Sequence, residues 1–447
     1  MNGETIYALA SGRGRAGIAV IRLSGPAAQS AVHKMTRARP LPRQAERVQI
    51  CHPTSGEHLD DSLVIFFPQP ASYTGEDVVE LHVHGGPAVI DGVLGALRES
   101  AELRMAEPGE FTRRAFENGK MDLTAAEAVA DLINAEVAAQ RRQALRQGGG
   151  ALARLCDGWR DRLVAAQAHW EAAIDFSDED LPADLEARTC DELNALAAEI
   201  QKNLADGHQG ERLRDGVHLA IIGPPNAGKS SLLNLLARRD VAIVSEFAGT
   251  TRDIIEVHLD LGGYPVIAAD TAGIRDSAEP IEHEGVRRAR ARAEDADLRL
   301  VVFESGEWPP EAGMHDDILK PGAIVAINKI DRAPAPTGLS FGDHHVFPIS
   351  VHSGEGVDAL LAGLEREVAG GFEAGAAIAV TQARHREALE ECVRELAVFL
   401  QRENRLENPE IGAEDLRLAA RAVGRITGRV DVEDLLDVIF SDFCIGK

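Results

Sequence analysis

The pattern of apolar and polar positions changes twice along the chain. Residues 1–119 mix short apolar runs with turns: AGIAVIRLSG and SLVIFFPQP have the composition of strands, and DVVELHVHGG alternates in the strand period before a glycine turn. From Lys120 the pattern becomes helical in LTAAEAVADLINAEVAAQRRQALRQGGG, with Thr124 and Glu127 at the spacing of a capping box. Further helical stretches cover roughly 151–174 and 185–205. We therefore expect an N-terminal domain of strands and helices, followed by a helical domain.

The second change follows the polar segment ADGHQGERLRDG (205–216), whose glycines and charges predict a linker. The apolar runs VHLAII, VHLDL, PVIAAD, LRLVVF, AIVAIN and HVFPIS then alternate with helical stretches, which indicates a mostly parallel α/β sheet. After AGGFEAGAA (369–377) the pattern is helical again from about Arg384 to the end. The α/β unit is therefore predicted to be inserted into a helical domain formed from two chain segments. The expected domains are 1–119, 120–214, 215–373 and 374–447.

The bulk composition is that of a globular protein. A chain of 447 residues is long enough for two to four domains, and 45% hydrophobic with 27% charged residues is ordinary. The formal net charge of −25 argues against a simple nucleic-acid coat, which would be basic overall, although it leaves room for a local basic face.

The cysteines and the N-terminus bear on the compartment. Five cysteines are scattered without a CxxC pair, which favours free thiols in a reducing compartment over disulfides or a zinc site. The segment MNGETIYALASGRGRAG lacks the basic start and apolar core of a secretory signal. No apolar run approaches the roughly eighteen residues that would span a bilayer. We expect a soluble cytoplasmic protein with no membrane span.

A phosphate-binding loop is the first chemical motif. GPPNAGKS (223–230) fits G-x-x-x-x-G-K-[ST] directly after an apolar strand and before a helix. Its glycines allow the tight curl that aims successive backbone N–H groups at phosphate oxygens. Lys229 would supply positive charge to the outer phosphates, and Ser230 would ligate Mg²⁺.

The motif NKID (328–331) identifies the base. The carboxylate of Asp331 would accept two hydrogen bonds from the guanine edge, whereas adenine lacks the amino group and presents a ring acceptor there. Asn328 and Lys329 would brace this aspartate, and Ser350, in ISVHSGEG, stands where related loops approach the base. The order of the motifs predicts a Ras-like P-loop GTPase domain.

The segment DTAGIRD (270–276) raises a catalytic question. Many GTP-hydrolysing domains place a glutamine after this phrase to align the attacking water. Ile274 stands here instead and can neither donate nor accept a hydrogen bond. Upstream, Thr251 in AGTTRD is placed to be a second hydroxyl ligand of Mg²⁺. The polar residues after the phrase leave the choice of a substitute open: Arg275, Asp276, Glu279, Glu282, His283 and Glu284.

The whole chain resembles the MnmE (TrmE) family of tRNA-modifying GTPases. The resemblance rests on GRGRAGIAVIRLSG, ELHVHGG, NGKMDLTAAEA, PNAGKSSLLN, AGTTRD, DTAGIR, NKID and the closing FCIGK, which together cover nearly all of it. It implies a homodimeric GTP hydrolase that acts with the FAD-dependent partner MnmG. Together they would install a carboxymethylaminomethyl group at C5 of the wobble uridine of certain tRNAs. The flavin belongs to the partner, since no G-x-G-x-x-G fingerprint follows a strand here.

The resemblance also answers the question of Ile274. It implies that a K⁺ ion supplies the positive charge that an arginine finger brings elsewhere, held by Asn226 and by the loop from Ser245 to Thr251. The potassium ligands of that loop would be Ser245, Phe247 and Thr250, and Glu282 would position the attacking water. The implied nucleotide-binding residues are Asn226, Ala227, Gly228, Lys229, Ser230, Ser231, Ser245, Glu246, Phe247, Ala248, Gly249, Thr250, Thr251, Asp270, Thr271, Ala272, Gly273, Asn328, Lys329, Asp331 and Ser350.

The same resemblance implies that the N-terminal domain binds a tetrahydrofolate one-carbon donor of the 5-formyl or 5,10-methylene type. The contacts would be Arg22, Glu80, Lys120 and Lys447. Glu80 suits the donor edge of a pterin and the cations suit its glutamate carboxylates. Without the resemblance each of the four is more often an ordinary surface ion pair. His82 and His84 share a strand face, which with no evident third ligand indicates a polar wall rather than a metal site.

Several features leave alternatives open. Cys444 is a candidate catalytic thiol near the one-carbon unit, or a plain free thiol. Arginines recur at every fourth position at Arg417, Arg421, Arg425 and Arg429. They would form either a basic stripe that contacts tRNA phosphates or a solvated helix face paired with neighbouring acids. Two rival functions remain, a GTP-dependent RNA or ribosome assembly factor without modification chemistry, and a switch that depends on an external activator.

Overall fold

The computed structural model describes residues 3–12, 14–175, 185–243, 256–270, 296–309, 323–333, 344–372, 380–402, 408–430, 433–441 and 443–447. It divides into two compact units. One contains residues 1–130, 148–161 and 420–447, and the other contains residues 131–147 and 162–419. Within the described residues, no helix combines the length and apolar character needed to cross a bilayer.

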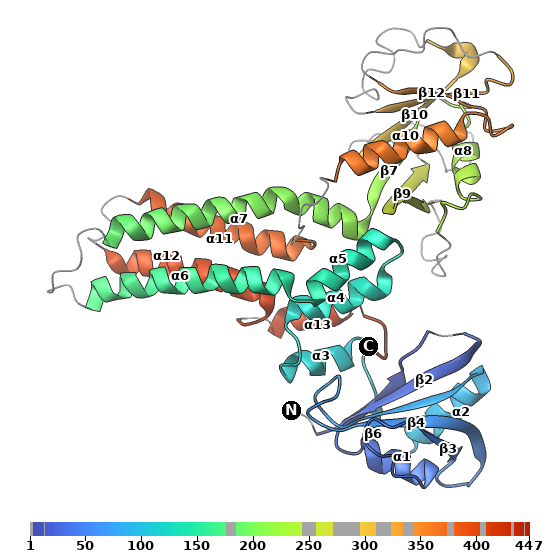
Figure 1. Cartoon of the computed structure of the whole chain (residues 1–447), viewed down its shortest axis with the longest axis vertical. Helices are drawn as coiled ribbons and strands as arrows, with labels where there is room; N and C mark the ends of the chain where they lie inside the picture. Colours follow the sequence, from blue (N-terminus) through green and yellow to red (C-terminus); the bar gives the residue numbers. More distant parts are fainter. Residues whose placement is uncertain are drawn as a thin grey trace, which may run out of the picture. The chain divides into compact units, whose positions relative to one another are not determined.

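The N-terminal domain is a six-stranded mixed sheet with helices on one face (Figure 1). The strands lie in the order β3-β4-β5-β2-β1-β6, with β1 and β6 parallel and the other pairs antiparallel. Its elements are β1 (Thr5–Leu9), β2 (Ala16–Ser24), α1 (Ala28–Thr36), β3 (Glu46–Cys51), β4 (His58–Phe67), β5 (Val78–Gly85), α2 (Pro87–Arg98), β6 (Leu103–Met105) and α3 (Glu110–Glu117).

Strand periodicity decides which face of this sheet is buried. Alternate residues such as Ile21 in β2 and Leu81 in β5 pack against Val32 of α1 and Val93 of α2, and all four are fully buried. The intervening residues form the other face, where Val20 pairs with His82 and Arg22 with Glu80. One face is therefore covered by helices, while the other carries polar and apolar side chains together.

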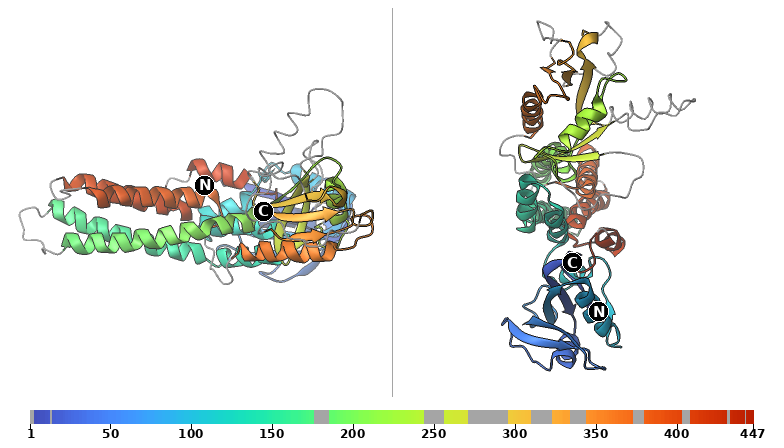
Figure 2. Two further views of the ribbon diagram at one scale, coloured as in Figure 1. Left: turned by 90° about the horizontal axis from the view of Figure 1, so that it is seen from above. Right: turned by 90° about the vertical axis from the view of Figure 1, so that its right-hand side faces the viewer.

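The helices after this domain lie in both compact units. They are α4 (Leu123–Asn134), α5 (Ala138–Gly148), α6 (Ala151–Asp175), α7 (Leu185–Asp215), α11 (Ala383–Gln401), α12 (Pro409–Thr427) and α13 (Glu433–Ser441). Helices α7 and α11, almost 200 residues apart in sequence, run alongside each other (Figures 1 and 2). Trp170 of α6 packs edge-on against Phe399 of α11, with ring centroids 4.9 Å apart. A Cβ at Gly412 of α12 would lie 2.6 Å from Trp170 Nε1, so the glycine permits this packing.

Three local expectations for these helices were wrong. The helix predicted from Lys120 onwards is broken at residues 135–137 into α4 and α5. Its cap is Asp122, whose Oδ1 accepts from the backbone N–H of Ala125 at 3.0 Å, because the helix begins at Leu123 rather than after Thr124. The expected linker at 205–216 is helical through Asp215, since Glu211 pairs with Arg386 of α11 and Leu213 is buried in the core of the following sheet.

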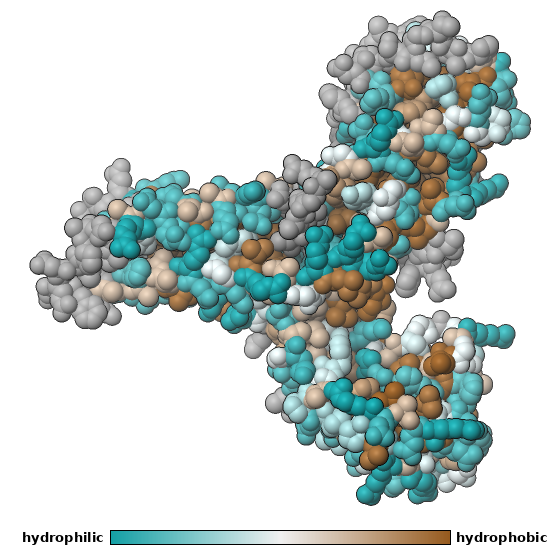
Figure 3. Space-filling view, viewed as in Figure 1, coloured by the Kyte–Doolittle hydropathy of each residue, from teal (hydrophilic) through white to brown (hydrophobic). Residues whose placement is uncertain are grey.

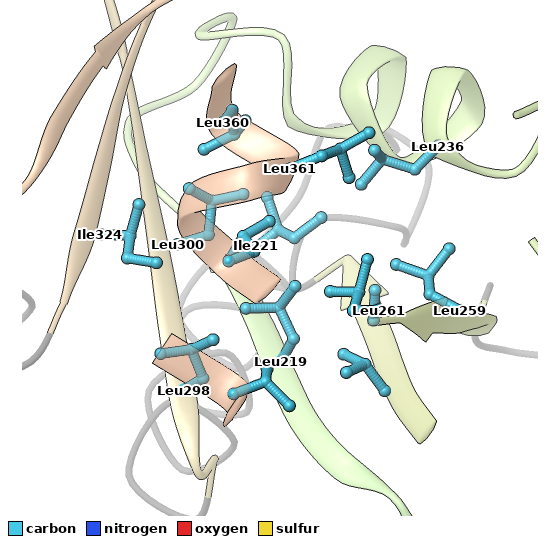
Figure 4. Packing of buried hydrophobic residues seen from close by; sticks show 14 of the residues in the cluster. Leu219, Ile221, Leu236, Leu259, Leu261, Leu298, Leu300, Ile324, Leu360 and Leu361 are labelled. Carbon is cyan, nitrogen blue, oxygen red and sulfur yellow. The ribbon is translucent and has the colours of Figure 1, made fainter. Parts of the chain in front are cut away.

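The second sheet has six strands in the order β12-β11-β10-β7-β9-β8, which are parallel except for β8 at one edge. Its elements are β7 (Val217–Ile222), α8 (Lys229–Leu236), β8 (Glu256–Leu261), β9 (Tyr264–Asp270), β10 (Leu298–Glu304), the short 3₁₀ helix η1 (Ser305–Glu307), β11 (Ile324–Asn328), β12 (Val346–Pro348) and α10 (Val357–Gly370). Figure 4 shows Leu219, Ile221 and Leu300 of the central strands meeting Leu361 of α10 and Leu236 of α8. The α/β plus α fold class is confirmed.

The segment from Glu136 to Ala139, which includes the start of α5, also packs into this core. Val137 and Ala139 are buried in the same cluster as the sheet, and the N–H of Ala139 donates to the carbonyl oxygen of Gly263 at 3.3 Å. Glu136 pairs with His258 of β8 at 2.9 Å. Residues 136–139 therefore attach the first helical segment directly to the sheet.

The C-terminal tail is held in the N-terminal domain. Ile445 forms a β-bridge with Pro108, and the backbone N–H of Phe111 donates to the carbonyl oxygen of Lys447 at 3.1 Å. Gly446 has a φ of 100°, and a Cβ there would lie 2.1 Å from the carbonyl oxygen of Leu9. Only glycine fits that backbone and that space. The tail residues therefore lie between the end of β1 and the start of α3.

Candidate functional site

The ends of the parallel strands assemble one site. The C-terminal ends of β7, β9, β10 and β11 lie at the same edge of the sheet because these strands are parallel neighbours. They carry the phosphate loop after Ile222, Asp270, Glu304 and Asn328. The chain leaves β7 toward β9 on one side and returns to β10 on the other, which is a topological switch point where open α/β sheets bind ligands.

The phosphate loop approaches the neighbouring strand closely. Gly223 has a φ of 144°, and a Cβ there would lie 2.1 Å from the carbonyl oxygen of Val302 in β10. Gly228 has a φ of 98°, and a Cβ there would lie 2.2 Å from Nδ2 of Asn328, so no larger residue fits beside that side chain. Asn226 is left-handed at a φ of 63° and exposed. The two glycines therefore fit the loop against β10 and Asn328 while it curls into helix α8.

Lys229 lies inside this curl. Its Nζ donates to the carbonyl oxygens of Gly223 at 3.0 Å and Pro224 at 2.9 Å, and its side chain is buried. The ammonium group is thus held at the loop that would surround the phosphates. Ser230, the next residue of α8, is exposed at the start of the helix, as is Ser231. A hydroxyl beside an ammonium at a helix N-terminus fits the Mg²⁺ and phosphates of a nucleotide.

Asn328 joins three loops through one side chain. Its Nδ2 donates to the carbonyl oxygen of Ala227 in the phosphate loop at 2.8 Å. Its Oδ1 accepts from the backbone N–H of Lys329 at 2.8 Å and from that of Val351 at 3.1 Å. The side chain is 3% exposed, so these bonds do not compete with water. The phosphate loop and the base-recognition loops are therefore fixed relative to one another.

Asp331 is oriented by Ser350. The buried Ser350 hydroxyl donates to Asp331 Oδ1 at 2.6 Å and accepts from the backbone N–H of Ser353 at 3.1 Å. The hydrogen bond from Ser350 holds the pKa of Asp331 below its usual range. An exposed, ionised carboxylate accepts hydrogen bonds only, which suits the two donors of guanine.

Sequence reasoning missed two residues of this site. Glu304 Oε2 lies 2.5 Å from Lys329 Nζ, and the hydroxyl of Ser305 donates to the carbonyl oxygen of Lys329 at 3.1 Å. Both follow the apolar run LRLVVF, so the rule that ligands gather at the carboxyl ends of parallel strands was a signal that could have found them.

Eleven of the expected nucleotide-site residues lie outside the described residues. They are Ser245, Glu246, Phe247, Ala248, Gly249, Thr250, Thr251, Thr271, Ala272, Gly273 and Glu282. Asp270 is described only as the end of β9, paired in register with Ile221 of β7.

The expected folate residues lie near the loop of residues 68–77, which joins β4 to β5, and near Phe111 of α3. Arg22 and Glu80 are paired across β2 and β5, with Arg22 Nε 3.0 Å from Glu80 Oε1. The Arg22 guanidinium lies over the rings of Tyr73 at 5.4 Å and Phe111 at 5.7 Å. Lys447 is bonded through its backbone to that same Phe111.

Lys120 and the neighbouring histidines complete this region. Lys120 Nζ donates to the carbonyl oxygen of Pro70 at 2.9 Å, in the loop that also carries Tyr73. His82 Nε2 lies 3.2 Å from Glu80 Oε2, and His84 Nδ1 lies 2.7 Å from Asp60 Oδ1. Among the described residues, no three His, Cys, Asp or Glu side chains are grouped to hold a metal ion.

An ion-pair network fixes this loop to helix α3. Arg114 bonds Glu76 at 2.9 Å and Glu110 at 3.0 Å, while Arg104 bonds Glu110 at 2.6 Å. Burial alone would raise the pKa of Glu110, but the hydrogen bonds from Arg104, the Glu107 backbone and Arg114 outweigh it and lower that pKa. These residues border an open cavity of about 570 Å³.

Two family models match the chain and place it among known proteins. Residues 5–120 match the GTP-binding protein TrmE N-terminus, and residues 123–444 match the MnmE helical domain. Full-length relatives agree: the tRNA modification GTPase MnmE of Paramagnetospirillum magneticum is 55% identical over 99% of this chain and 100% of its own, and that of Parvibaculum lavamentivorans is 56% identical over 99% and 100%. The chain belongs to the MnmE family of tRNA modification GTPases.

A mitochondrial protein is also similar to this chain. The zebrafish 5-taurinomethyluridine-[tRNA] synthase subunit GTPB3, mitochondrial, is 48% identical over 99% of this chain and 93% of its own. Among solved structures, Era in complex with MgGDPNP and a segment of 16S ribosomal RNA is 32% identical over 34% of this chain and 56% of its own, with a TM-score of 0.27. As an MnmE-family protein, this chain is a GTP hydrolase of tRNA modification that binds GTP and Mg²⁺.

The arginine stripe of this MnmE-family chain is partly neutralised. Helix α12 ends at Thr427, so Arg429 lies beyond it. Arg417 forms two hydrogen bonds with Glu414, at 2.7 and 2.6 Å, and Arg429 pairs with Asp157 at 2.8 Å. The pattern of acids beside exposed arginines is typical of a solvated face. Contact with tRNA phosphates stays an untested prediction.

We predict that Ser350→Ala weakens GDP binding about fivefold at pH 7, because Asp331 loses the hydrogen bond that orients it. Titration with a fluorescent guanine nucleotide measures the effect. Guanine affinity requires the carboxylate, so it is present at neutral pH and lost as the pH falls through the lowered pKa; the variant moves that loss to higher pH. The exposed Ser353→Ala is the control, and unchanged affinity in Ser350→Ala would contradict the assignment.

Proposed function

We propose that the chain is a potassium-activated GTPase that acts with the FAD-dependent partner MnmG in the cytoplasm. Together they would install the carboxymethylaminomethyl group at C5 of the wobble uridine of certain tRNAs, with a tetrahydrofolate derivative as one-carbon donor. The observation that carries the proposal is full-length membership of the MnmE family combined with an ordered guanine-nucleotide site. We also propose that the chain is divided into a folate-binding and dimerisation domain (1–119), a helical domain in two parts (120–214 and 374–447) and a GTPase domain (215–373).

Potassium would replace a missing catalytic group. Ile274 occupies the position where many GTPases use a glutamine, and its side chain is apolar. Asn226 lies exposed at the phosphate loop in a left-handed conformation, and the ammonium group of the buried Lys229 is bonded to the carbonyl oxygens of Gly223 and Pro224 in the same loop. An amide oxygen there suits a monovalent cation beside the β- and γ-phosphates, where positive charge offsets the charge that builds on the leaving oxygen. The loop from Ser245 to Thr250 and Glu282 would complete the arrangement.

A movement of the GTPase domain caused by GTP hydrolysis would reach the helical domain through the segment 136–139. This segment is attached to strand β8 by the Glu136–His258 pair and to the β8–β9 turn through Gly263. Because Val137 and Ala139 are part of the sheet's core, a displacement of the GTPase domain would move the start of α5 with it. This is a physical route by which GTP turnover would reach the helical domain.

We predict that GTP turnover is faster by an order of magnitude or more in KCl than in NaCl at equal ionic strength, because potassium stabilises the transition state. Steady-state phosphate release measures it. Asn226→Ala should abolish the stimulation while GDP affinity is retained. Equally slow turnover in both salts would contradict potassium activation and favour a switch that needs an external activator.

Folate binding is supported by the chemistry gathered around Phe111. The Arg22–Glu80 pair offers an acceptor for a pterin edge and a cation, and the half-buried ring of Tyr73 offers an apolar face, while the fully buried Phe111 packs against the Arg22 guanidinium. The backbone of Lys447 is fixed beside Phe111, and the exposed Cys444 is the candidate thiol of this region. A second cation at Lys120 would meet the glutamate part of the ligand.

We predict that Lys447→Ala weakens binding of 5-formyltetrahydrofolate about tenfold, because one charge-assisted hydrogen bond to a carboxylate is lost. The backbone bonds of the tail stay intact in this variant, so the fold is expected to be retained. Isothermal titration measures folate and GDP affinity in parallel. Lys34→Ala, an exposed lysine of the same domain, is the control. Undiminished folate affinity would exclude Lys447 as a contact.

A homodimer is supported by the open face of the N-terminal sheet. Ile18 of β2 is 63% exposed and Leu63 of β4 is 43% exposed, and Leu63, His82 and Val20 form one row across the strands. Apolar side chains are visible among polar ones on the surface of this domain (Figure 3). The next row contains Glu80 and Arg22, so a second copy on this face would also cover the folate residues.

We predict that Ile18→Glu converts a dimer into a monomer, since a buried charge would replace an apolar contact. Size-exclusion chromatography with light scattering measures the mass. Val438→Glu, which changes an equally exposed apolar residue of α13, is the matched control. A wild-type monomer would contradict the dimer, and an unchanged dimer in Ile18→Glu would exclude this face.

A further inference from the structure

We propose that Glu304 is a positioning residue for guanine recognition and acts on Asp331 through Lys329. The proposal rests on the guanine-nucleotide site described above. It concerns the end of β10, which carries none of the nucleotide motifs. Glu304 is the last residue of this strand and is paired in register with Asn328 of β11.

The backbone of Lys329 is held in an uncommon conformation. Its φ is 67°, in the left-handed region that non-glycine residues seldom adopt. The backbone N–H donates to Asn328 Oδ1, and the carbonyl oxygen accepts from the Ser305 hydroxyl at 3.1 Å. Such a conformation persists where neighbouring bonds impose it. Ser305 is 7% exposed, so its bond to Lys329 is shielded from water.

The same carbonyl begins the turn that contains Asp331. It accepts from the backbone N–H groups of Arg332 at 2.9 Å and Ala333 at 3.3 Å. Asp331 lies inside that turn, and the Ser350 hydroxyl donates a hydrogen bond to its side chain. A rotation of Lys329 about its backbone would therefore shift the carboxylate that has to meet the guanine edge.

Glu304 restrains that rotation. Its carboxylate lies 2.5 Å from Lys329 Nζ, and the two side chains are 29% and 22% exposed. An ion pair between a fully exposed lysine and a carboxylate contributes little to the stability of a protein. This pair is half-buried, however, and Lys329 is already fixed at its N–H and carbonyl, so the ammonium is the remaining end of the residue to be held. Glu304 and Ser305 together clamp Lys329 from one strand end.

This clamp serves selectivity rather than general affinity. Guanine offers Asp331 two donors, the ring N–H and the amino group, whereas hypoxanthine offers only the ring N–H. Both bonds form only when the carboxylate is correctly placed and oriented. A misplaced carboxylate loses mainly the second bond. GDP carries guanine, and inosine diphosphate (IDP) carries hypoxanthine. The ratio of the affinity for GDP to the affinity for IDP therefore measures how well Asp331 is positioned.

The test is nucleotide selectivity of Glu304→Gln in the full-length protein, with GDP and IDP titrated in the presence of Mg²⁺. Glutamine keeps the size of the side chain and removes the charge. The expected result is a GDP-to-IDP affinity ratio reduced about three- to tenfold. Glu304→Asp, which keeps the carboxylate, should restore part of the ratio. Glu102→Gln, which breaks the exposed Lys34–Glu102 pair of the N-terminal domain, is the matched control and should leave the ratio unchanged.

The contrary results are distinct. An unchanged ratio in Glu304→Gln overturns the proposal, as does an equal loss of GDP and IDP affinity, which would indicate only a general structural role. Ser305→Ala gives an independent test if Glu304→Gln does not fold, and an unchanged ratio there likewise overturns the clamp. A wild-type protein without preference for GDP over IDP would instead contradict the guanine site itself.

Discussion

The close fit between the phosphate loop and the Asn328 side chain is the contact on which the GTPase domain depends. One buried amide bonds Ala227 on one side and Lys329 and Val351 on the other. The loop can approach because Gly228 has no Cβ, and Gly223 allows the same approach to Val302. A larger residue at Gly228 would displace the Asn328 side chain, and one at Gly223 would collide with the backbone of Val302, since the nearest atoms leave no space.

From this contact the base site is built in successive layers. Asn328 places Lys329, the carbonyl of Lys329 begins the turn of Asp331, and Ser350 orients the carboxylate and lowers its pKa. Each layer relies on a partner from another strand end, because parallel strands bring their carboxyl ends together. In the N-terminal domain an ion-pair network has a comparable role, since Arg114 ties the loop at Glu76 to helix α3.

Sequence patterns predicted the strands and nucleotide motifs well, and failed where tertiary packing decided. The runs VHLAII, LRLVVF and AIVAIN became central strands because a continuous apolar run suits a sheet buried on both faces. The polar segment 205–216 was predicted as a linker from its glycines, yet α7 extends to Asp215 because Leu213 is buried and Glu211 pairs with Arg386. Glu304 escaped notice because its partner is 25 residues away in the chain.

The sequence by itself determined most of the strands and helical stretches, the family and the identity of the base, since periodicity and short motifs are local properties of the chain. It also indicated that Ile274 cannot align water. Only the tertiary structure decided which side chains meet. Asn328 and Ala227 are 101 residues apart, and Arg22 meets Glu80 across 58 residues. Strand order and register create such pairs, and no local pattern specifies either, because each depends on how whole elements bury their apolar faces together.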